Sequence, residues 1–349
     1  MTAETITTPD IEPGQSYEIC RFQPGDAEGV ARLFYSVYGS GYPVRTYLEA
    51  ELLIKENEAQ RIISSVARTR RGDIVGHTAL FNSAPHPGTY EVGAGLVHTA
   101  YRGGKKIFTQ LAIHSRDLAA TLPGVDAAFG EPVCNHPFSQ KLMENLGFLP
   151  SSLEVDLMPA EAYVKEASAS GRVAAFLNFK TYQKNPHTVY LPRIYAKELP
   201  FFYEGLDDER DFLIAENETC TENDTDLKLQ IFDFAGVARV AIHAVGRDFL
   251  ARIEALEKEL QEKNVLVIQI WLNFADTCIG KAVEILRMRG YFLGGILLRW
   301  FDTDGLLMQK IRKHPDWDGI YTHTDRYGQI LKMVRSDWER SIKEKHDGY

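Results

Sequence analysis

The sequence has few cysteines and no long apolar run, and it carries no excess of positive charge. Its four cysteines lie far apart and form no CxxC pair, so neither a disulfide framework nor a zinc knuckle is expected. No apolar run approaches the roughly 20 residues that span a bilayer. The net charge is −9 over 349 residues. This argues against a general nucleic-acid binder, because such proteins need clustered Lys and Arg.

The start of the sequence also lacks the features of a secretory signal. Its first fifteen residues contain neither a basic segment nor an apolar core, which predicts a cytoplasmic protein without a membrane partner. The chain is longer than one hydrophobic core usually organises, so two domains are expected. We predict a flexible tail over residues 1–16, a first domain over 17–162 and a second domain over 170–340.

Hydrophobic periodicity gives the order of elements in the first domain. Apolar residues at helical spacing alternate with segments of period two, and the turn 69–73 between two such segments is typical of a hairpin. The predicted strands are 18–22, 62–68, 74–81, 90–97, 127–133 and 153–158, and the predicted helices follow Asp26 and cover about 44–55, 105–121 and 137–146. Antiparallel strands followed by alternating strands and helices predict one mixed sheet with helices on its faces.

The later part of the chain repeats the second half of this order. Helices are predicted over 246–263 and 276–289, and strands over 265–272, 291–300 and 306–311. Gly147-Phe148 and Gly290-Tyr291 take equivalent places, each directly after a predicted helix, where glycine commonly ends it. The predicted fold class is therefore α+β, with two similar domains that each contain a mixed, mostly antiparallel sheet flanked by helices.

The most informative segment runs from the strand ending at Val97 through a glycine- and lysine-rich turn into a helix. Unpaired N–H groups at a helix N-terminus suit phosphate oxygens, and glycines let the main chain approach a bulky anion. Gly93 and Gly95 inside the preceding strand predict a bulge or a close backbone approach. A Gly-Gly turn followed by lysines is also common as a plain solvated loop. The turn matches neither the Walker A pattern nor the dinucleotide fingerprint.

With this arrangement the chain resembles the GNAT acyltransferase superfamily over residues 17–158. The resemblance rests on the segments RRGDIVGHTALF, LVHTAYRGGKKIFTQL and CNHPFSQKLMENLGF. It implies acetyl-CoA as co-substrate, with the thioester arm held between the strands 90–97 and 127–133. The coenzyme-binding residues that it implies are Val97, Arg102, Gly103, Gly104, Lys105, Lys106, Ile107, Phe108 and Asn135. Two departures are visible: the glycine pair is displaced by one position, and Met143 stands where the family often has a proton-donating tyrosine.

Acyl transfer to an amine needs a base, because a free alkylamine is protonated at neutral pH. The candidates for the base are Glu91, His98 and His136, and the candidate replacements for the missing tyrosine are Ser139 and Cys134. Each has a structural alternative: Glu91 as a solvent-facing residue, His98 as ordinary filling and His136 as part of a helix start capped by Asn135. A backbone N–H near Val97 or His98 is expected to meet the developing oxyanion. No metal site is expected, since the crowd of His and Asp near the C-terminus matches no ligand spacing.

These observations predict an acyl-CoA-dependent N-acyltransferase that acts on a small amine or an amino-acid-like acceptor. The alternative is a non-catalytic module that binds acyl-CoA or a partner protein, and a homo-oligomer is compatible with either. In the second domain the turn equivalent to 101–106 is Ala244–Asp248, with one glycine and a carboxylate that would repel pyrophosphate. We therefore expect the second domain to be a degenerate copy without coenzyme binding.

Overall fold

The computed structural model describes residues 11–103, 106–160, 171–206, 208–216 and 220–347. The chain divides into two compact units. The first unit contains Met1–Ser83 and Pro87–Ala128, and the second contains Ala84–His86 and Phe129–Tyr349. The domain boundary expected between 162 and 170 lies outside the described residues, whereas the contacts divide the chain near Ala128, so residues 129–160 of the expected first domain belong to the second unit. Each unit has its own hydrophobic core.

The first unit is built on four antiparallel strands that neighbour one another in chain order. The strands are β1 (Tyr17–Arg21), β2 (Ile62–Thr69), β3 (Ile74–Asn82) and β4 (Thr89–Val97), and the helices are α1 (Ala27–Tyr38), α2 (Ala50–Glu58) and α3 (Ile107–Ala119). The predicted order of these elements is confirmed. Only α2 begins clearly later than expected, because Arg45–Tyr47 form a separate 3-10 turn.

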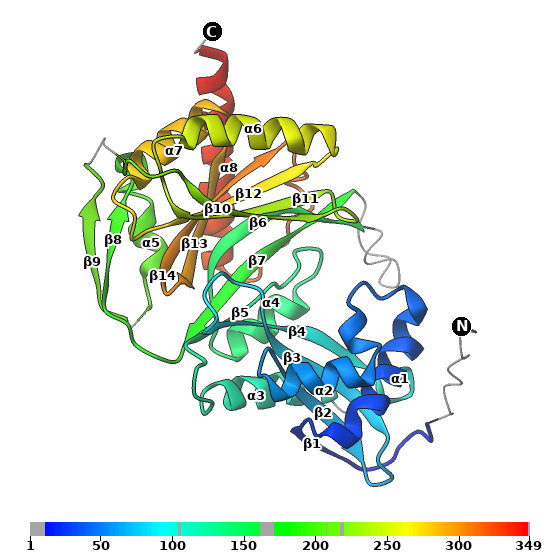
Figure 1. Ribbon diagram of the computed structural model, residues 1–349. Helices are drawn as coiled ribbons and strands as arrows, with labels where there is room; N and C mark the ends of the chain where they lie inside the picture. The colour runs from blue at the N-terminus through cyan, green and yellow to red at the C-terminus, as the bar shows by residue number, and fades with distance from the viewer. Residues whose placement is uncertain (1–10, 104–105, 161–170, 207, 217–219, 348–349) are drawn as a thin grey trace. The chain divides into compact units, whose positions relative to one another are not determined.

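Helices cover both faces of this sheet, as two adjacent residues of β3 show. The ring of His77 contacts Phe34 of α1 with 5.3 Å between ring centroids. Its neighbour Gly76 faces α3, where an added Cβ would lie 2.9 Å from a methyl carbon of Ile107. Successive side chains of a strand point to opposite faces, so α1 and α3 lie on opposite faces of the sheet (Figure 1). The absence of a side chain at Gly76 permits the close approach of α3.

The second unit contains a larger sheet that is mixed and mostly antiparallel. Its strand order is β7-β6-β13-β14-β12-β11-β10, and β5, which begins at the division between the units, lies beside β7. The strands are β5 (Ala127–Gly130), β6 (Leu149–Pro159), β7 (Arg172–Thr181), β10 (Asp226–Phe232), β11 (Val237–Ala244), β12 (Val267–Asn273), β13 (Phe292–Phe301) and β14 (Thr303–Ile311). The helices are α4 (Phe138–Asn145), α5 (Leu199–Tyr203), α6 (Phe249–Glu262), α7 (Ile279–Met288) and α8 (Asp325–Asp347).

The second unit contains an internal structural repeat. In β5–α4–β6–β7 the last strand returns between the first two, and β12–α7–β13–β14 follows the same path. The helices of both copies end alike: Gly147 (φ 76°) and Gly290 (φ 84°) adopt left-handed conformations. The next residue, Phe148 or Tyr291, donates its N–H back to the helix over 3.0 Å in each copy. This agrees with the equivalence predicted for the two glycine–aromatic pairs.

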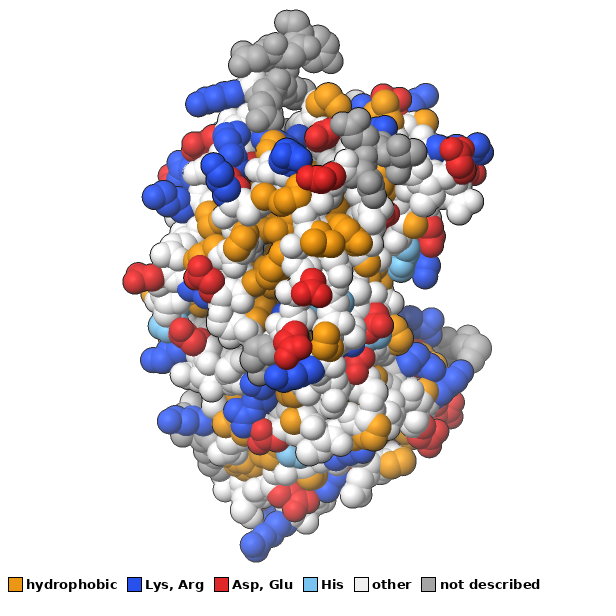
Figure 2. Space-filling view, turned by 90° about the vertical axis from the view of Figure 1, so that its left-hand side faces the viewer, with side chains coloured by type: hydrophobic (Ala, Val, Ile, Leu, Met, Phe, Trp, Pro, Cys, Tyr) orange, Lys and Arg blue, Asp and Glu red, His pale blue; other side chains and the backbone are white. Residues whose placement is uncertain are grey.

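Two peripheral features complete the second unit. Strands β8 (His187–Leu191) and β9 (Arg210–Ile214) pair in parallel as a separate small sheet. Phe212, Leu213 and Ile214 of β9 are exposed, and hydrophobic side chains gather on the face that carries these strands (Figure 2). Helix α8 packs against β13 and β6. Among the helices of the described residues, none has the length and apolar character needed to cross a membrane.

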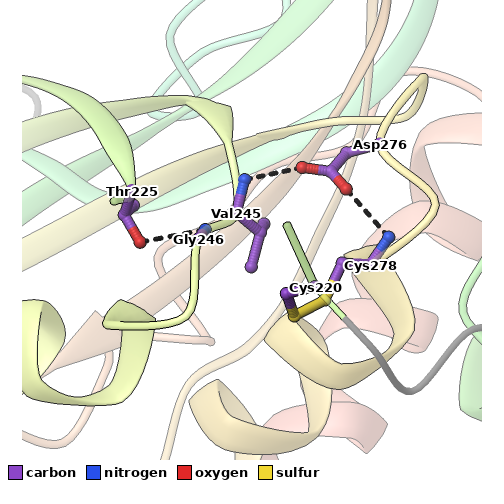
Figure 3. The surroundings of a disulfide bond; sticks show 6 residues. All are labelled: Cys220, Thr225, Val245, Gly246, Asp276 and Cys278. Carbon is purple, nitrogen blue, oxygen red and sulfur yellow. Dashed lines mark hydrogen bonds between the residues drawn. A yellow bond between two sulfur atoms is a disulfide. The ribbon is translucent and has the colours of Figure 1, made fainter. Parts of the chain in front are cut away.

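The structure corrects one expectation about the cysteines. Cys220 and Cys278 form a disulfide with their Cα atoms 5.2 Å apart (Figure 3), within the usual range for such bonds. They are separated by 58 residues in the sequence. The expectation of no disulfide was wrong because this proximity arises from the fold and leaves no local spacing pattern. Cys20 and Cys134 are free thiols, half-buried and buried respectively.

Candidate functional site

The strand β4 is interrupted by a bulge at its centre. His77 pairs with Leu96 and Ala79 pairs with Gly93, so one residue of β3 faces both Ala94 and Gly95. Ala94 adopts a left-handed conformation with φ 49°. This arrangement is a β-bulge, and it confirms the prediction made from the glycines of this strand. An added Cβ at Gly95 would lie 2.5 Å from the ring of Phe108, so the absence of a side chain lets that ring approach the bulge.

Glu91 lies two residues before Gly93 on the same strand. Its side chain is half-buried, and Oε2 accepts a hydrogen bond from the Ser83 hydroxyl over 2.8 Å. A Cβ added at Gly93 would lie 3.4 Å from Oε1 of Glu91. It would also lie 3.0 Å from the ring of Phe81, so the absence of a side chain at Gly93 lets this ring and the carboxylate approach the main chain before the bulge. The alternative of Glu91 as a fully solvent-facing residue does not match its half-buried position.

Aromatic rings from the α1 region lie on the same side of the sheet as Glu91. We call Phe34, Tyr38, Tyr42 and Tyr47 the aromatic layer. Phe34 stacks on Tyr47 at 4.7 Å, and Tyr38 and Tyr42 lie 5.0 Å apart, measured between ring centroids. Burial raises the pKa of Tyr42 and Tyr47 above the usual range for tyrosine, and the charges of a neighbouring tyrosine and of Glu91 add to this. Both hydroxyls therefore stay protonated near neutral pH.

The segment 102–106, which we call the glycine–lysine turn, lies between the end of β4 and α3. Arg102 donates from Nε to the carbonyl oxygen of Val97 over 3.0 Å, which ties the turn to the strand. Gly103 has φ 77°, and a side chain there would meet nothing within 4 Å. Lys106 is exposed and is the N-cap of α3. Gly104 and Lys105, also predicted to bind coenzyme, lie outside the described residues.

The two residues after the turn have different surroundings. Ile107 is buried beneath the sheet, whereas Phe108 is 44% exposed. The first N–H groups of a helix point out of its N-terminus, where the helix dipole is positive. Helix α3 is 13 residues long. The turn thus combines an open main chain, exposed cationic side chains and a helix N-terminus, which together suit a diphosphate.

His98 lies where β4 ends. Its backbone N–H donates to the carbonyl oxygen of Val75 over 2.9 Å, so this amide is already used in a hydrogen bond to strand β3. Its ring is half-buried, and Nδ1 accepts a 3.4 Å hydrogen bond from the Ala100 N–H. The ring therefore acts as the N-cap of the short turn Thr99–Tyr101. This local structural role competes with a role as base.

The remaining predicted site residues belong to the second unit. Asn135 and His136 are half-buried, and His136 lies 5.5 Å from Phe138 between ring centroids. The Ser139 hydroxyl lies 3.5 Å from the carbonyl oxygen of Val133. Met143 is buried in α4 and has no proton to donate, so this position supplies no proton donor.

The equivalent turn of the second unit is closed by the chain itself. In the segment Val245–Asp248, which we call the closed turn, the N–H of Val245 donates to Asp276 over 2.6 Å and that of Gly246 donates to the Thr225 hydroxyl over 3.1 Å (Figure 3). The N–H of Arg247 donates to the carbonyl oxygen of Asn223. A Cβ added at Gly246 would lie 2.4 Å from that same oxygen. At Gly103, by contrast, an added Cβ would meet no atom within 4 Å.

The strands before and after the closed turn also leave no gap. β11 and β12 pair in parallel through six consecutive residue pairs from Val237–Val267 to Ile242–Leu272. The Asp276 carboxylate also accepts the Cys278 N–H over 2.8 Å. The disulfide therefore ties the chain that precedes the covering segment Asn223–Thr225 to the beginning of α7. These contacts support the expected loss of coenzyme binding in the second copy.

A scan against protein-family models finds no match to the chain, and a search of curated proteins finds none either. Solved structures do match part of it. The matched proteins are GNAT N-acetyltransferases. They include the ribosomal-protein-S5-alanine acetyltransferase from Vibrio fischeri, with 14% identity and a TM-score of 0.38, covering 48% of this chain and 93% of that one.

Two further matches have the same character. An N-acetyltransferase from Staphylococcus aureus shows 14% identity and a TM-score of 0.39, covering 48% of this chain and 99% of that chain. The structure of yncA from Salmonella typhimurium with its cofactor acetyl-CoA shows 13% identity and a TM-score of 0.38. It covers 49% of this chain and 96% of its own. Each of these three matches covers about half of this chain.

Sequence reasoning missed two parts of the site. It gave no role to His77, whose ring lies beneath the bulge, and it placed Tyr47 in a helix instead of in the aromatic layer. A histidine inside an otherwise apolar strand was a signal for the first. The close spacing of Tyr38, Tyr42 and Tyr47 was a signal for the second, because tyrosines gather where an apolar body needs a polar end.

Proposed function

We propose that this protein is an acyl-CoA-dependent N-acyltransferase that transfers an acetyl group from acetyl-CoA to a small amine. One observation carries the proposal. A single strand, β4, holds a half-buried carboxylate at Glu91 and a backbone bulge at Ala94, and it leads into the open cationic turn before α3. Along the nine residues of β4 and the turn that follows it, the chain thus presents three groups in order. They are a proposed base, a place for close backbone approach and a proposed diphosphate site.

On the coenzyme side, Arg102, Gly103 and Lys106 would bind the diphosphate together with the N-terminus of α3. Gly104 and Lys105 remain assigned to the same role. The exposed ring of Phe108 and the end of β4 at Val97 would contact the coenzyme beyond its diphosphate. Asn135 stays a candidate for the pantetheine arm. Charged hydrogen bonds of this type contribute about 1.5–3 kcal/mol each.

On the acceptor side, the aromatic layer and Glu91 offer the chemistry that attracts an ammonium group. Aromatic faces attract cations, and a nearby carboxylate adds a charged hydrogen bond. The ammonium must lose a proton before its nitrogen attacks the thioester carbon. Glu91 is the proposed proton acceptor, with His98 and His136 as the other candidates. The carbon–sulfur bond then breaks, and the coenzyme thiolate takes up a proton, for which Ser139 is the candidate donor.

Calorimetric titration of the full chain with acetyl-CoA tests the coenzyme site. The wild-type chain should bind, and Arg102→Glu should weaken binding by at least about tenfold, as expected from the loss of one charged contact and the gain of a repulsive one. Arg116→Glu makes the same charge change in the last turn of α3, at the end of the helix away from Arg102, and should leave the affinity nearly unchanged. Equal affinities for all three proteins would refute the assignment of the turn.

An assay for free thiol release over a panel of primary amines tests the reaction. Glu91→Gln should lower kcat by about 10²-fold or more, which is the usual contribution of a general base. The aromatic layer predicts that cationic amines are better acceptors than neutral ones. The alternative function, a non-catalytic acyl-CoA-binding or interaction module, gains support from the buried Met143. It would be established by binding of acetyl-CoA without turnover of any amine.

A further inference from the structure

We infer that His77 is a positioning residue that fixes the orientation of the β4 bulge and thereby aims the Gly95 N–H toward the side of the sheet where α3 begins. The catalytic consequence rests on the proposed function, whereas the structural part does not.

The bulge carbonyls are held by side chains of β3. His77 lies beneath the bulge with 0% exposure, and its Nδ1 lies 2.9 Å from the carbonyl oxygen of Ala94. Thr78, on the opposite face of the same strand, donates its hydroxyl to the carbonyl oxygen of Gly93 over 3.1 Å. Two successive carbonyls of β4 are therefore bound by side chains on opposite faces of the sheet.

The hydrogen-bond partners determine the tautomer of His77. A carbonyl oxygen can only accept, so Nδ1 carries the proton and donates to Ala94. Nε2 is then an acceptor, and it lies 3.0 Å from the Ser64 hydroxyl. Burial lowers the pKa of His77 to about 4, although the hydrogen bond to Ala94 opposes this effect. The ring is therefore neutral at pH 7, which this tautomer requires.

The network continues away from the bulge and anchors the ring. Ser64 donates its backbone N–H to Oδ1 of Asn57 over 2.8 Å. The His77 ring also lies edge-on to Phe34 and Tyr47, with centroids 5.3 and 5.4 Å away. A buried ring with both nitrogens bonded and two aromatic neighbours has little freedom to rotate. It is suited to hold a neighbouring peptide in one orientation.

The orientation of that peptide decides where its N–H points. In a planar trans peptide the C=O and N–H bonds point in opposite directions. Because the Ala94 carbonyl is bound on the face of the aromatic layer, the Gly95 N–H is directed toward the opposite face, where Phe108 and α3 lie. Along the chain Gly95 lies between Glu91 and the proposed diphosphate turn, and a backbone donor at this point of the strand can stabilise charge that develops on a thioester oxygen.

Two substitutions of the same residue separate positioning from packing. In His77→Asn the side-chain amide can take the place of Nδ1 and still donate to Ala94. In His77→Gln the amide takes the place of Nε2 and reaches Ser64 instead. Ser64→Ala removes the second contact of the ring without touching the bulge, and it serves as the matched control.

The readouts are the hydrogen-exchange rate of the Gly95 amide, the Kd for acetyl-CoA, and kcat with the best amine acceptor. We expect His77→Gln to increase Gly95 exchange and to lower kcat by at least about tenfold, the scale of losing a positioned oxyanion donor, with a Kd within about twofold of wild type. His77→Asn and Ser64→Ala should stay close to wild type in all three. Equal losses in His77→Asn and His77→Gln, or unchanged Gly95 exchange in His77→Gln, would overturn the inference. A wild-type chain without turnover would refute the proposed enzyme function, while Gly95 exchange would still decide the role of His77.

Discussion

Breaking the disulfide between Cys220 and Cys278 should loosen the closed turn of the second unit. The bond joins residues separated by 58 positions, and in the chain-entropy treatment a loop of this length corresponds to about 4 kcal/mol at 25 °C. For a unit of this size such a loss corresponds to a fall in Tm of about 10 °C. Cys220 is half-buried whereas Cys278 is buried, so a dithiol reductant would attack the Cys220 sulfur.

Hydrogen exchange of the full chain, with and without dithiothreitol, gives the required local resolution. Reduction should speed exchange in the segment 220–226 and at Val245, Gly246 and Arg247, whose N–H groups that segment and Asp276 now occupy. Cys278→Ser should reproduce the effect without reductant. Cys20→Ser, which removes a free thiol of the first unit, should not. Unchanged exchange at the closed turn after full reduction would show that the disulfide does not hold the covering segment in place.

Other predictions concern single side chains. The free energy of unfolding of the first unit should fall by about 3 kcal/mol as the pH drops from 6.5 to 4. The reason is that the histidine of the unfolded chain binds a proton in this range, whereas buried His77 stays neutral down to its lowered pKa of about 4. Hydrogen exchange of the β3 amides measures this fall, and His77→Asn should remove it. Burial raises the pKa of Glu154 to about 8 against the opposing effect of Arg239, so the stability of the second unit should decline between pH 4.5 and 8 and decline less in Glu154→Gln, as followed by denaturant unfolding. Gly246→Ala should unfold the closed turn, since its Cβ would meet a backbone oxygen at 2.4 Å, whereas Gly103→Ala should cost only about 1 kcal/mol for its left-handed backbone. Calorimetry should find one acetyl-CoA per chain, and two equivalent sites would contradict the degenerate second copy.

The sequence predicted those elements whose apolar residues repeat with a clear period. The amphipathic helix α6 and the apolar run of β12 were both found within a few residues of their observed ends. Strands β10 and β11 were not predicted, although their position before α6 completes the repeated order. In β10 the residues alternate between exposed and half-buried positions, and the acidic residues around Asp226 had favoured a surface loop.

The candidate site was predictable where it depends on local sequence and not where it depends on register. Gly93 and Gly95 indicated the bulge because glycine inside a strand has few other reasons to be there. The role of His77 depends instead on which residue of β4 lies opposite it, and pairing registers are not visible in one sequence. The disulfide is a similar case, since two cysteines far apart in the chain meet only through the arrangement of β11, β12 and α7.

The two strand–turn–helix segments differ in which groups use the backbone donors of the turn. In the second unit a carboxylate, a hydroxyl and a carbonyl already accept from Val245, Gly246 and Arg247, so a ligand would have to displace three satisfied hydrogen bonds. Each buried donor left without a partner costs about 1–3 kcal/mol, so displacement without full replacement is unfavourable. At Gly103 the surroundings are open, and a diphosphate that binds there gains contacts without breaking this kind of network. Under the proposed function the same helix-terminal geometry would bind a ligand in the first unit, whereas in the second unit it is a structural joint, because there the chain covers the turn.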